Sequence, residues 1–236
     1  PVRLSIKRWW RRSSSLVEGC NARKIMPTQE LETCLAPSDY EDVVRAALAE
    51  DLGRGDRTSE LAVQAGTRAC GKLTAKESMR VAGLPVAEFA FKLVDPKADW
   101  SAKTAEGERV AASTVLAEVS GDARALLAAE RVALNFLQNL SGIAALTGTF
   151  AEKLKGTRTL LRDTRKTLPG LRALQKYAVR LGGGINHRMG LYDAVLIKEN
   201  HAAAAGGVDD ILRHGVAGGM AAELLHNFQS APHTGS

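Results

Sequence analysis

The sequence predicts a mixed fold, in which a sandwich-like α+β domain is followed by an incomplete α/β barrel. Two observations predict it. Between Arg68 and Gly121, short strand-like runs alternate with turns, as in small α+β domains. After Gly156 the pattern changes to strand, helix, strand, helix, which is typical of the opening of an α/β barrel or a doubly wound sheet. The chain is therefore divided into a basic leader, an α+β domain, the first part of a barrel and an atypical tail: 1–37, 38–155, 156–207 and 208–236.

The net charge of the chain is carried by its leader. The 236 residues have a formal charge of +6, and by itself this value favours a polyanionic partner such as nucleic acid. Residues 1–25 hold seven basic residues and one acidic residue, whereas the remainder holds 25 of each sign. The leader shows no helix or strand period, so we expect 1–37 to be disordered. Its origin has three possible explanations. It is sequence upstream of a natural start at Met26, a targeting segment or a functional arm.

Composition excludes several classes of protein. No apolar run approaches the roughly 18 residues that a membrane span needs, so we expect no contact with a membrane. Cys20, Cys34 and Cys70 match neither a metal-ligand spacing nor a disulfide framework, which favours a cytoplasmic, reducing compartment. We expect no nucleic-acid binding by a body that is neutral overall, although interleaved Arg and Trp in the leader would permit it.

The α+β domain begins with a helix that Ser38 and Glu41 cap and Gly53 ends, followed by a polar connector to Thr58. A second helix is expected at about Pro85 to Leu93. Three segments have strand character: Leu73–Lys76, Trp100–Thr104 and Val115–Val119. These elements predict the small α+β unit.

A long helix follows, capped by Asp122. Its core stripe has three- and four-residue spacing: Leu126, Ala129, Ala133, Leu137 and Leu140. A polar row of Arg131, Asn135 and Gln138 marks another face. We expect Ser141-Gly142 to break this helix, with a second helix continuing to about Lys155.

The barrel part is predicted to contain two strands and two helices. A strand covers Thr159–Asp163, and a helix covers Leu168–Leu181 and ends at Gly182-Gly183-Gly184. The continuous apolar centre of Tyr192–Lys198 is typical of a parallel strand buried on both faces. The last helix, Ala202–Ala205, stops at two glycines, and we expect the nearby His201 to be its cap.

The barrel part also carries a local excess of positive charge. From Lys155 to Lys198 there are ten basic and two acidic residues. Arg165, Lys166 and Lys198 follow predicted strands, where side chains of such folds point into the active-site mouth, so a small polyanionic ligand is predicted. Three other basic residues of this segment are expected to lie on a face exposed to solvent: Arg158, Arg172 and Lys176.

Four motifs occur in order: Glu130-Arg131-Val132-Ala133-Leu134-Asn135, Asp163-Thr164-Arg165-Lys166-Thr167, Gly182-Gly183-Gly184-Ile185-Asn186-His187-Arg188 and Leu196-Ile197-Lys198-Glu199-Asn200-His201. Together they resemble the quinolinate phosphoribosyltransferase family, the decarboxylating nicotinate-nucleotide pyrophosphorylases of NAD biosynthesis. Glu50-Asp51-Leu52-Gly53 with Gly55-Asp56 also matches, and the resemblance covers about residues 38–207.

The resemblance implies a phosphoribosyltransferase that uses quinolinate and phosphoribosyl pyrophosphate with magnesium. Lys198 would face the phosphoribosyl group, and Lys166 and Lys198 are the catalytic candidates. The arginine at the position of Arg131 is delivered by the other subunit of a dimer in this family, which implies a homodimer or higher homo-oligomer. The residues implied to hold quinolinate are Arg131, Thr164, Arg165, Lys166, His187 and Arg188.

The tail departs from the family pattern. Family barrels continue with strands that carry magnesium carboxylates and a phosphate-binding turn, whereas Asp209, Asp210 and Glu223 lie in no strand context. The tail is typical of a truncation or a shifted reading frame, so we expect that this chain does not convert the substrates into products. The alternatives are an inactive dimerising remnant and a sibling enzyme acting on a related anionic ring.

Overall fold

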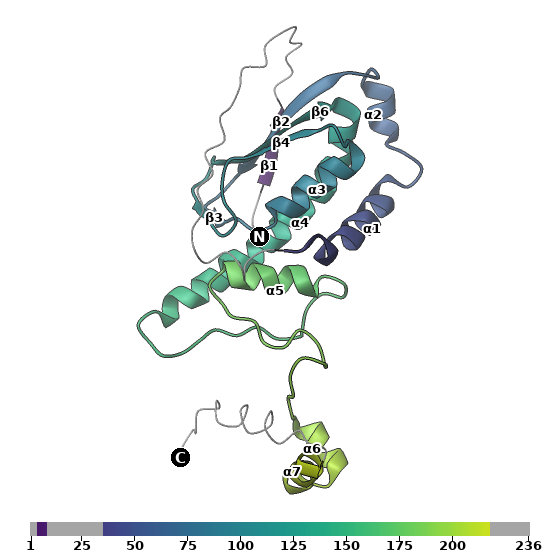
Figure 1. The fold of residues 1–236 in the computed structure, drawn as a ribbon. Coiled ribbons are helices and arrows are strands. Elements are labelled where there is room, and N and C mark those ends of the chain that lie inside the picture. The colour runs from purple at the N-terminus through teal and green to yellow at the C-terminus, as the bar shows by residue number, and fades with distance from the viewer. Residues whose placement is uncertain (1–3, 9–34, 218–236) are drawn as a thin grey trace. The chain divides into compact units, whose positions relative to one another are not determined.

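The computed structural model describes residues 4–8 and 35–217, which fall into two compact units with a boundary between Asn186 and His187. Each unit is described by itself (Figure 1). The first unit contains helices and sheet, as predicted. Its strands are β1 (Leu4–Arg8), β2 (Arg68–Ala75), β3 (Met79–Arg80), β4 (Asp99–Ala102), β5 (Arg109–Val110) and β6 (Val115–Asp122). Its helices are α1 (Glu41–Leu52), α2 (Arg57–Ala62), α3 (Leu84–Val94), α4 (Ala123–Leu154) and α5 (Arg172–Leu181).

The main sheet has four antiparallel strands in the order β1-β2-β6-β4, and β3 and β5 form a separate pair. The predicted segment Val115–Val119 lies within β6, whereas Leu73–Lys76 and Trp100–Thr104 overlap β2 and β4 in part. The two central strands, β2 and β6, place Leu73 opposite Ala117. The prediction that residues 1–37 lack regular structure is wrong at β1, which pairs with β2 so that Ile6 lies opposite Leu73. The rest of the leader, and its Trp-Arg cluster, lies outside the described residues.

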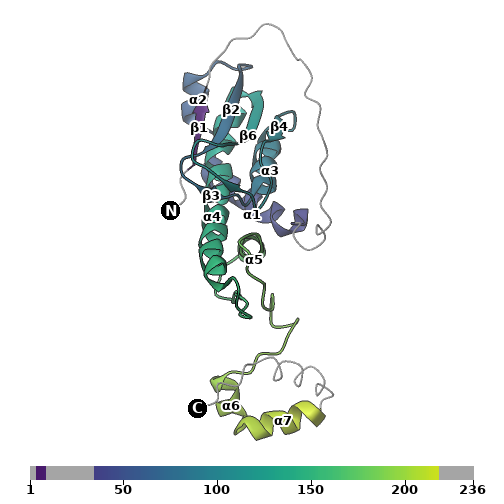
Figure 2. The ribbon, with the colours of Figure 1, turned by 90° about the vertical axis from the view of Figure 1, so that its left-hand side faces the viewer.

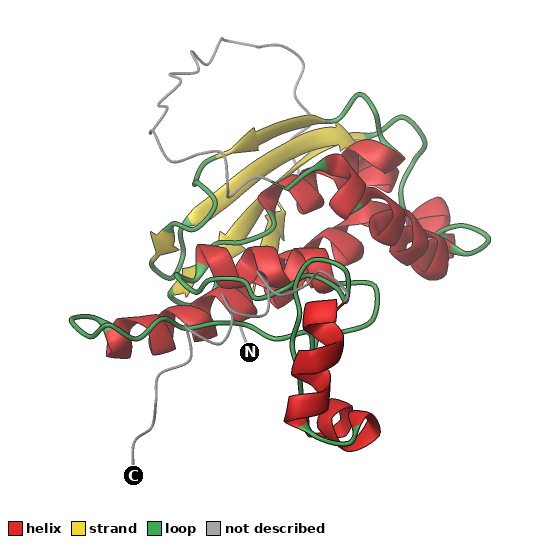
Figure 3. Cartoon of the chain, turned by 60° about the horizontal axis from the view of Figure 1, so that its bottom comes forward, coloured by secondary structure: helices red, strands yellow, loops and turns green. Residues whose placement is uncertain are grey.

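Helices cover one face of this sheet (Figure 3). The inward residues of β2 and β6, such as Leu73 and Leu116, are fully buried together with Phe91 of α3 and Leu137 of α4. Burying apolar area of this kind is the main favourable term in folding. The first unit therefore has one hydrophobic core, built between its sheet and its helices.

Helix α4 is one continuous helix of 32 residues. The side chain of Asp122 accepts hydrogen bonds from the backbone N–H groups of Arg124 and Ala125, which confirms the predicted cap. The predicted core stripe is buried, but the predicted break at Ser141-Gly142 is wrong. The Ser141 hydroxyl is fully buried and accepts from the N–H of Ala82 at 3.0 Å, so the serine joins α4 to the chain before α3.

Helix α1 begins later than the capping-box pattern predicts. A 3-10 turn covers Pro37–Asp39, and the carboxylate of Asp39, not Ser38, accepts the cap hydrogen bond, which comes from the N–H of Ala36. Gly53 ends α1 as predicted. The expected polar connector also contains the start of α2, which Asp56 caps; hydrogen bonds from Ser59 hold the pKa of that carboxyl below its usual value.

Helix α5 is tied to the rest of the first unit at its C-terminus and from its middle. At its C-terminus, a Cβ at Gly182 would lie 2.4 Å from Cβ of Thr147, so only glycine lets the chain approach α4 this closely. From its middle, the Tyr177 hydroxyl donates to the carboxylate of Glu106, which also accepts from the N–H groups of Gly83 and Leu84 at the start of α3. Burial raises the pKa of the Glu106 carboxyl above its ordinary value.

The predicted barrel strands do not form. Within Thr159–Asp163 only one parallel bridge is present, between Arg162 and Ile185. The segment Tyr192–Lys198 has no strand structure, and Tyr192 is 84% exposed. A parallel strand buried on both faces needs a hydrogen-bonding neighbour on each side, and no strand of the described residues lies beside this segment.

The second unit contains two described helices, α6 (Glu199–Ala205) and α7 (Val208–Ala217) (Figure 2). Gly206 ends α6 in the left-handed region, at the predicted position, and the imidazole of His201 accepts from the N–H of Lys198 as the predicted cap. No helix in residues 35–217 is both long and apolar enough to cross a membrane.

Candidate functional site

The segment that carries Arg165 and Lys166 is a loop fastened to the start of α5. The Thr164 hydroxyl accepts from the N–H of Lys166 at 3.0 Å, which closes a tight turn around Arg165. Two side chains of α5 complete the attachment. Arg172 donates to the Thr167 hydroxyl at 3.2 Å, and the amide oxygen of Gln175 accepts from the N–H of Leu168 at 3.0 Å. The loop is thus held along its length, while Lys166 remains exposed.

Arg165 presents a donor that the protein leaves unused. Its Nε is buried and has no hydrogen-bond partner, and the same is true of Nε in Arg180. A buried guanidinium N–H without an acceptor is costly, and such groups commonly mark positions where a ligand supplies the acceptor. Carboxylate oxygens match this donor, since the guanidinium fork binds them in two parallel hydrogen bonds.

A buried polar cluster lies directly before this loop. Nζ of Lys176 lies 2.6 Å from Oδ1 of Asp163, with side-chain exposures of 1% and 7%. With its amide nitrogen facing the acceptors, Asn186 donates to Oδ2 of Asp163 at 3.0 Å and accepts from Arg180 at 2.7 Å. The prediction that Lys176 belongs to an exposed basic face is therefore wrong, because the fold brings it against a carboxylate 13 residues away.

The first unit also presents the polar row of α4. Arg131 and Asn135 are exposed, as expected for a face that does not contact the core, whereas Gln138 is half-buried. Arg131 lies on α4, whereas Thr164, Arg165 and Lys166 lie in the loop before α5.

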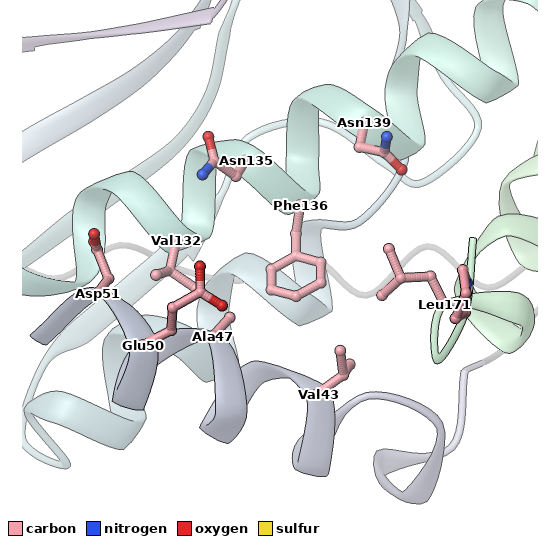
Figure 4. A pocket seen from close by; sticks show the side chains of 10 residues that line it. Val43, Ala47, Glu50, Asp51, Val132, Asn135, Phe136, Asn139 and Leu171 are labelled. Carbon is pink, nitrogen blue, oxygen red and sulfur yellow. The ribbon is translucent and has the colours of Figure 1, made fainter. Parts of the chain in front are cut away.

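A cavity of about 460 Å³ opens beside this row, between α1, α4 and the loop before α5 (Figure 4). Its lining includes the carboxylates of Glu50 and Asp51 and the amides of Asn135 and Asn139. None of the predicted quinolinate residues lines it, and its two carboxylates would repel a dicarboxylate. This cavity is therefore not the predicted anion site.

The other predicted site residues belong to the second unit. Arg188 donates from Nη1 to the carbonyl of Ala194 at 3.0 Å, and its Nε has no hydrogen-bond partner. Nδ1 of His187 accepts from the N–H of Arg188 at 2.7 Å. Lys198 is exposed and is the N-cap residue of α6. Its positive charge, like the positive end of a helix dipole, attracts an anion.

Sequence reasoning missed the cluster of Asp163, Lys176 and Asn186. One signal was available, because Asp163 is one of only two acidic residues among ten basic ones from Lys155 to Lys198. A lone carboxylate in such a segment indicates a partner among its neighbours. Which lysine or arginine pairs with it depends on the packing of α5, and no spacing rule gives that.

A metal site built by the protein was not predicted. In the part of the chain that the structure describes, no three His, Cys, Asp or Glu side chains gather in a way that could hold a metal ion.

Family models match most of the chain. The quinolinate phosphoribosyl transferase N-terminal domain matches residues 56–141, and the C-terminal domain of the same family matches 143–219. These two matches cover the whole region between α2 and α7.

Individual proteins agree with the models. The chain is 47% identical over 178 residues to a probable nicotinate-nucleotide pyrophosphorylase [carboxylating] of Synechocystis, covering 75% of this chain and 60% of that protein. It is 44% identical over 177 residues to quinolinate phosphoribosyltransferase [decarboxylating] 1b of Nicotiana tabacum, covering 74% of this chain and 49% of that protein. The chain thus spans about half to three fifths of the length of these curated relatives.

Solved structures give the same result. The crystal structure of NadC from Streptococcus pyogenes matches with a TM-score of 0.75 and 40% identity, over 79% of this chain and 67% of that one. The nicotinate-nucleotide pyrophosphorylase from Francisella tularensis matches with a TM-score of 0.74 and 37% identity, over 78% of this chain and 65% of that one. By motif order, family models and fold, the chain belongs to the quinolinate phosphoribosyltransferase family.

Proposed function

We propose that the protein transfers the phosphoribosyl group of phosphoribosyl pyrophosphate to quinolinate, with decarboxylation, in NAD biosynthesis in the cytoplasm. The products are nicotinate mononucleotide, pyrophosphate and carbon dioxide. The observation that carries the proposal is the buried, unpartnered Nε of Arg165 in a loop fastened to α5. Membership of the family and the names of the matched relatives support the same reaction.

Each candidate residue has a role in this proposal. Arg165 and Arg188 bind the quinolinate carboxylates through their guanidinium groups. Lys166 and Lys198 are the catalytic candidates, with Lys198 directed to the phosphoribosyl group. Further contacts to quinolinate come from Arg131, Thr164, Lys166 and His187. In this assignment, 156–207 corresponds to the opening of the family's α/β barrel, which the match over 143–219 supports.

The reaction has two steps. The lone pair of the ring nitrogen forms a bond to the anomeric carbon of the ribose, and the bond from that carbon to pyrophosphate breaks with its electrons on the leaving oxygen. The ring nitrogen is now positively charged, so it stabilises the electron pair left when the adjacent carboxylate departs as carbon dioxide. A proton then replaces the carboxylate. Cationic side chains assist by holding the ring in line and by stabilising charge on the leaving group.

Magnesium enters this proposal as part of the substrate, since phosphoribosyl pyrophosphate binds it. The described residues supply no carboxylate cluster for it, and no step here depends on a protein-bound metal.

Quinolinate binding tests the site. Calorimetry should give a Kd that rises at least tenfold when Arg165→Ala and Arg188→Ala are combined, since hydrogen bonds to charged groups contribute about 1.5–3 kcal/mol each. Arg158→Ala, which removes an exposed arginine of the same basic segment, is the matched control and should leave Kd unchanged. Equal affinity of the double variant and the original chain would show that the site assignment is wrong.

The departure of the tail from the family pattern led to the expectation that this chain does not convert its substrates, so turnover and assembly need separate measurements. We propose that the chain forms a homodimer in which the exposed Arg131 serves the partner's site. Light scattering at micromolar concentration should then give twice the chain mass of 25.2 kDa. Formation of nicotinate mononucleotide by the pure protein separates an active enzyme from a dimer that binds quinolinate without turning over, and a folded monomer would contradict the assembly proposed.

A further inference from the structure

The buried pair of Lys176 and Asp163 is expensive for the protein to maintain. Both side chains are almost fully withdrawn from water, at 1% and 7% exposure. The desolvation cost of such a pair commonly matches or exceeds its attraction, so two apolar side chains of similar size would serve stability as well. Lys72 and Glu118, by contrast, are paired on the surface with exposures of 50% and 37%. Stability alone therefore does not account for a charged pair at this place.

The pair lies where two parts of the chain meet. The N–H of Ile185 donates to the carbonyl of Leu161 at 2.8 Å, and the N–H of Asp163 donates to the carbonyl of Ile185 at 3.2 Å. Asn186 then closes the junction, because its amide donates both to Oδ2 of Asp163 and to the carbonyl of Lys176 at 2.9 Å.

Both segments of this junction are followed in sequence by residues of the proposed site. Asp163 is followed by Thr164-Arg165-Lys166, and Asn186 is followed by His187-Arg188. The ionic and amide contacts fix the side chains of the last residue before each of these segments.

We propose that Lys176, acting through Asp163 and Asn186, is a positioning residue that sets the direction in which the loop of Thr164, Arg165 and Lys166 leaves the junction. The inference rests on the proposed function. Lys176 does not itself contact substrate, since its ammonium group is buried and bound to Asp163. A charged pair suits this task because it accepts few alternative geometries, whereas apolar side chains pack in several.

The decisive variant is the pair Lys176→Met and Asp163→Leu, which removes both charges and keeps apolar side chains of similar size. Lys176→Met alone leaves a buried carboxylate without its partner and should lower the urea midpoint strongly, while the double variant should recover most of it. Its Kd for quinolinate should nevertheless stay about tenfold or more above the original, because a binding group displaced by an ångström loses much of its effect. Lys155→Met, at an exposed lysine, is the matched control.

A merely structural pair would give another pattern. Recovery of the quinolinate Kd together with the urea midpoint in the double variant would overturn the proposal, and so would loss of cooperative unfolding in that variant. Hydrogen exchange provides a readout without ligand: amides of 161–167 and 184–188 should exchange faster in the double variant at matched stability. If the original chain binds no quinolinate, the proposed function fails, and unchanged exchange would then overturn the positioning role as well.

Discussion

Two apolar runs with strand-like sequences have opposite outcomes in this molecule. Val115–Val119 becomes part of β6, which has hydrogen-bonded neighbours on both sides and a fully buried Leu116. Ala194–Ile197 forms no strand, and its Leu196 is 38% exposed. The difference teaches that an apolar run alone specifies neither a strand nor burial, because a strand also requires partners for its N–H and C=O groups.

The largest expected effect is a difference in the free energy of unfolding between variants of these two segments. Leu116→Ala should lower the free energy of unfolding by about 2–5 kcal/mol, because it leaves a cavity in the core between sheet and helices. Leu196→Ala is the same chemical change at a partly exposed site and should cost less than about 1 kcal/mol. Urea unfolding of both variants checks the pair. Similar losses would mean that the segment 194–197 is packed in solution as β6 is.

The next largest expected effect concerns the close packing of Gly182, at the C-terminus of α5, against α4. Gly182→Ala puts a methyl group against Thr147 and the carbonyl of Ala144, so α5 must move away from α4. We expect a loss of about 1–3 kcal/mol, as in other overpacked sites. Gly148→Ala is the control, since its new Cβ would meet nothing nearer than 3.4 Å. A Gly182→Ala variant as stable as the Gly148→Ala variant would show that α5 is not held tightly.

The smallest effect is a pH dependence of the link between α5 and α3. Burial raises the pKa of Glu106, so the folded state binds the proton more tightly than the unfolded chain does. The stabilisation is full below the unfolded pKa, near the ordinary value of 4.5, and is lost as pH rises through the folded pKa. Glu106→Gln cannot titrate, and its amide can donate to Tyr177 as the protonated acid would.

Urea unfolding between pH 4.5 and 8 tests this link. The advantage of the original chain over the Glu106→Gln variant should shrink as pH rises, because the folded state loses its tighter hold on the proton. An advantage that grows with pH would mean that the carboxylate is better stabilised folded than unfolded, against the direction expected from burial.

Local signals predicted the first unit well. Asp122 as a helix cap, the buried stripe of α4 and Gly53 as a helix end depend on neighbours in sequence, and all three are confirmed. Ser141-Gly142 misled because the serine hydroxyl finds its partner at Ala82, 59 residues away. One glycine inside a helix costs only about 1 kcal/mol, which the packing of α4 outweighs.

The site residues remain a prediction, whereas the contacts that hold their loop were not predicted from the sequence. Arg165 and Lys166 stood out as paired cations after an apolar run, and the structure fastens their loop to α5. Lys176 was assigned to the surface because helical spacing gives no information on a carboxylate in another segment. The strand expected over Tyr192–Lys198 failed for the related reason that pairing partners are a property of the whole sheet.

The pairing of β1 with β2 changes how a shorter version of the protein should be cut. Residues 1–25 carry the net charge of the chain, which makes them an obvious choice for trimming before expression or crystallisation. Removing Leu4–Arg8 would, however, leave the eight-residue β2 as an open edge, with unpaired N–H and C=O groups that can recruit strands of other molecules. A trimmed chain that precipitates would reflect this uncovered edge, and a better boundary keeps the first strand while shortening the segment that follows it.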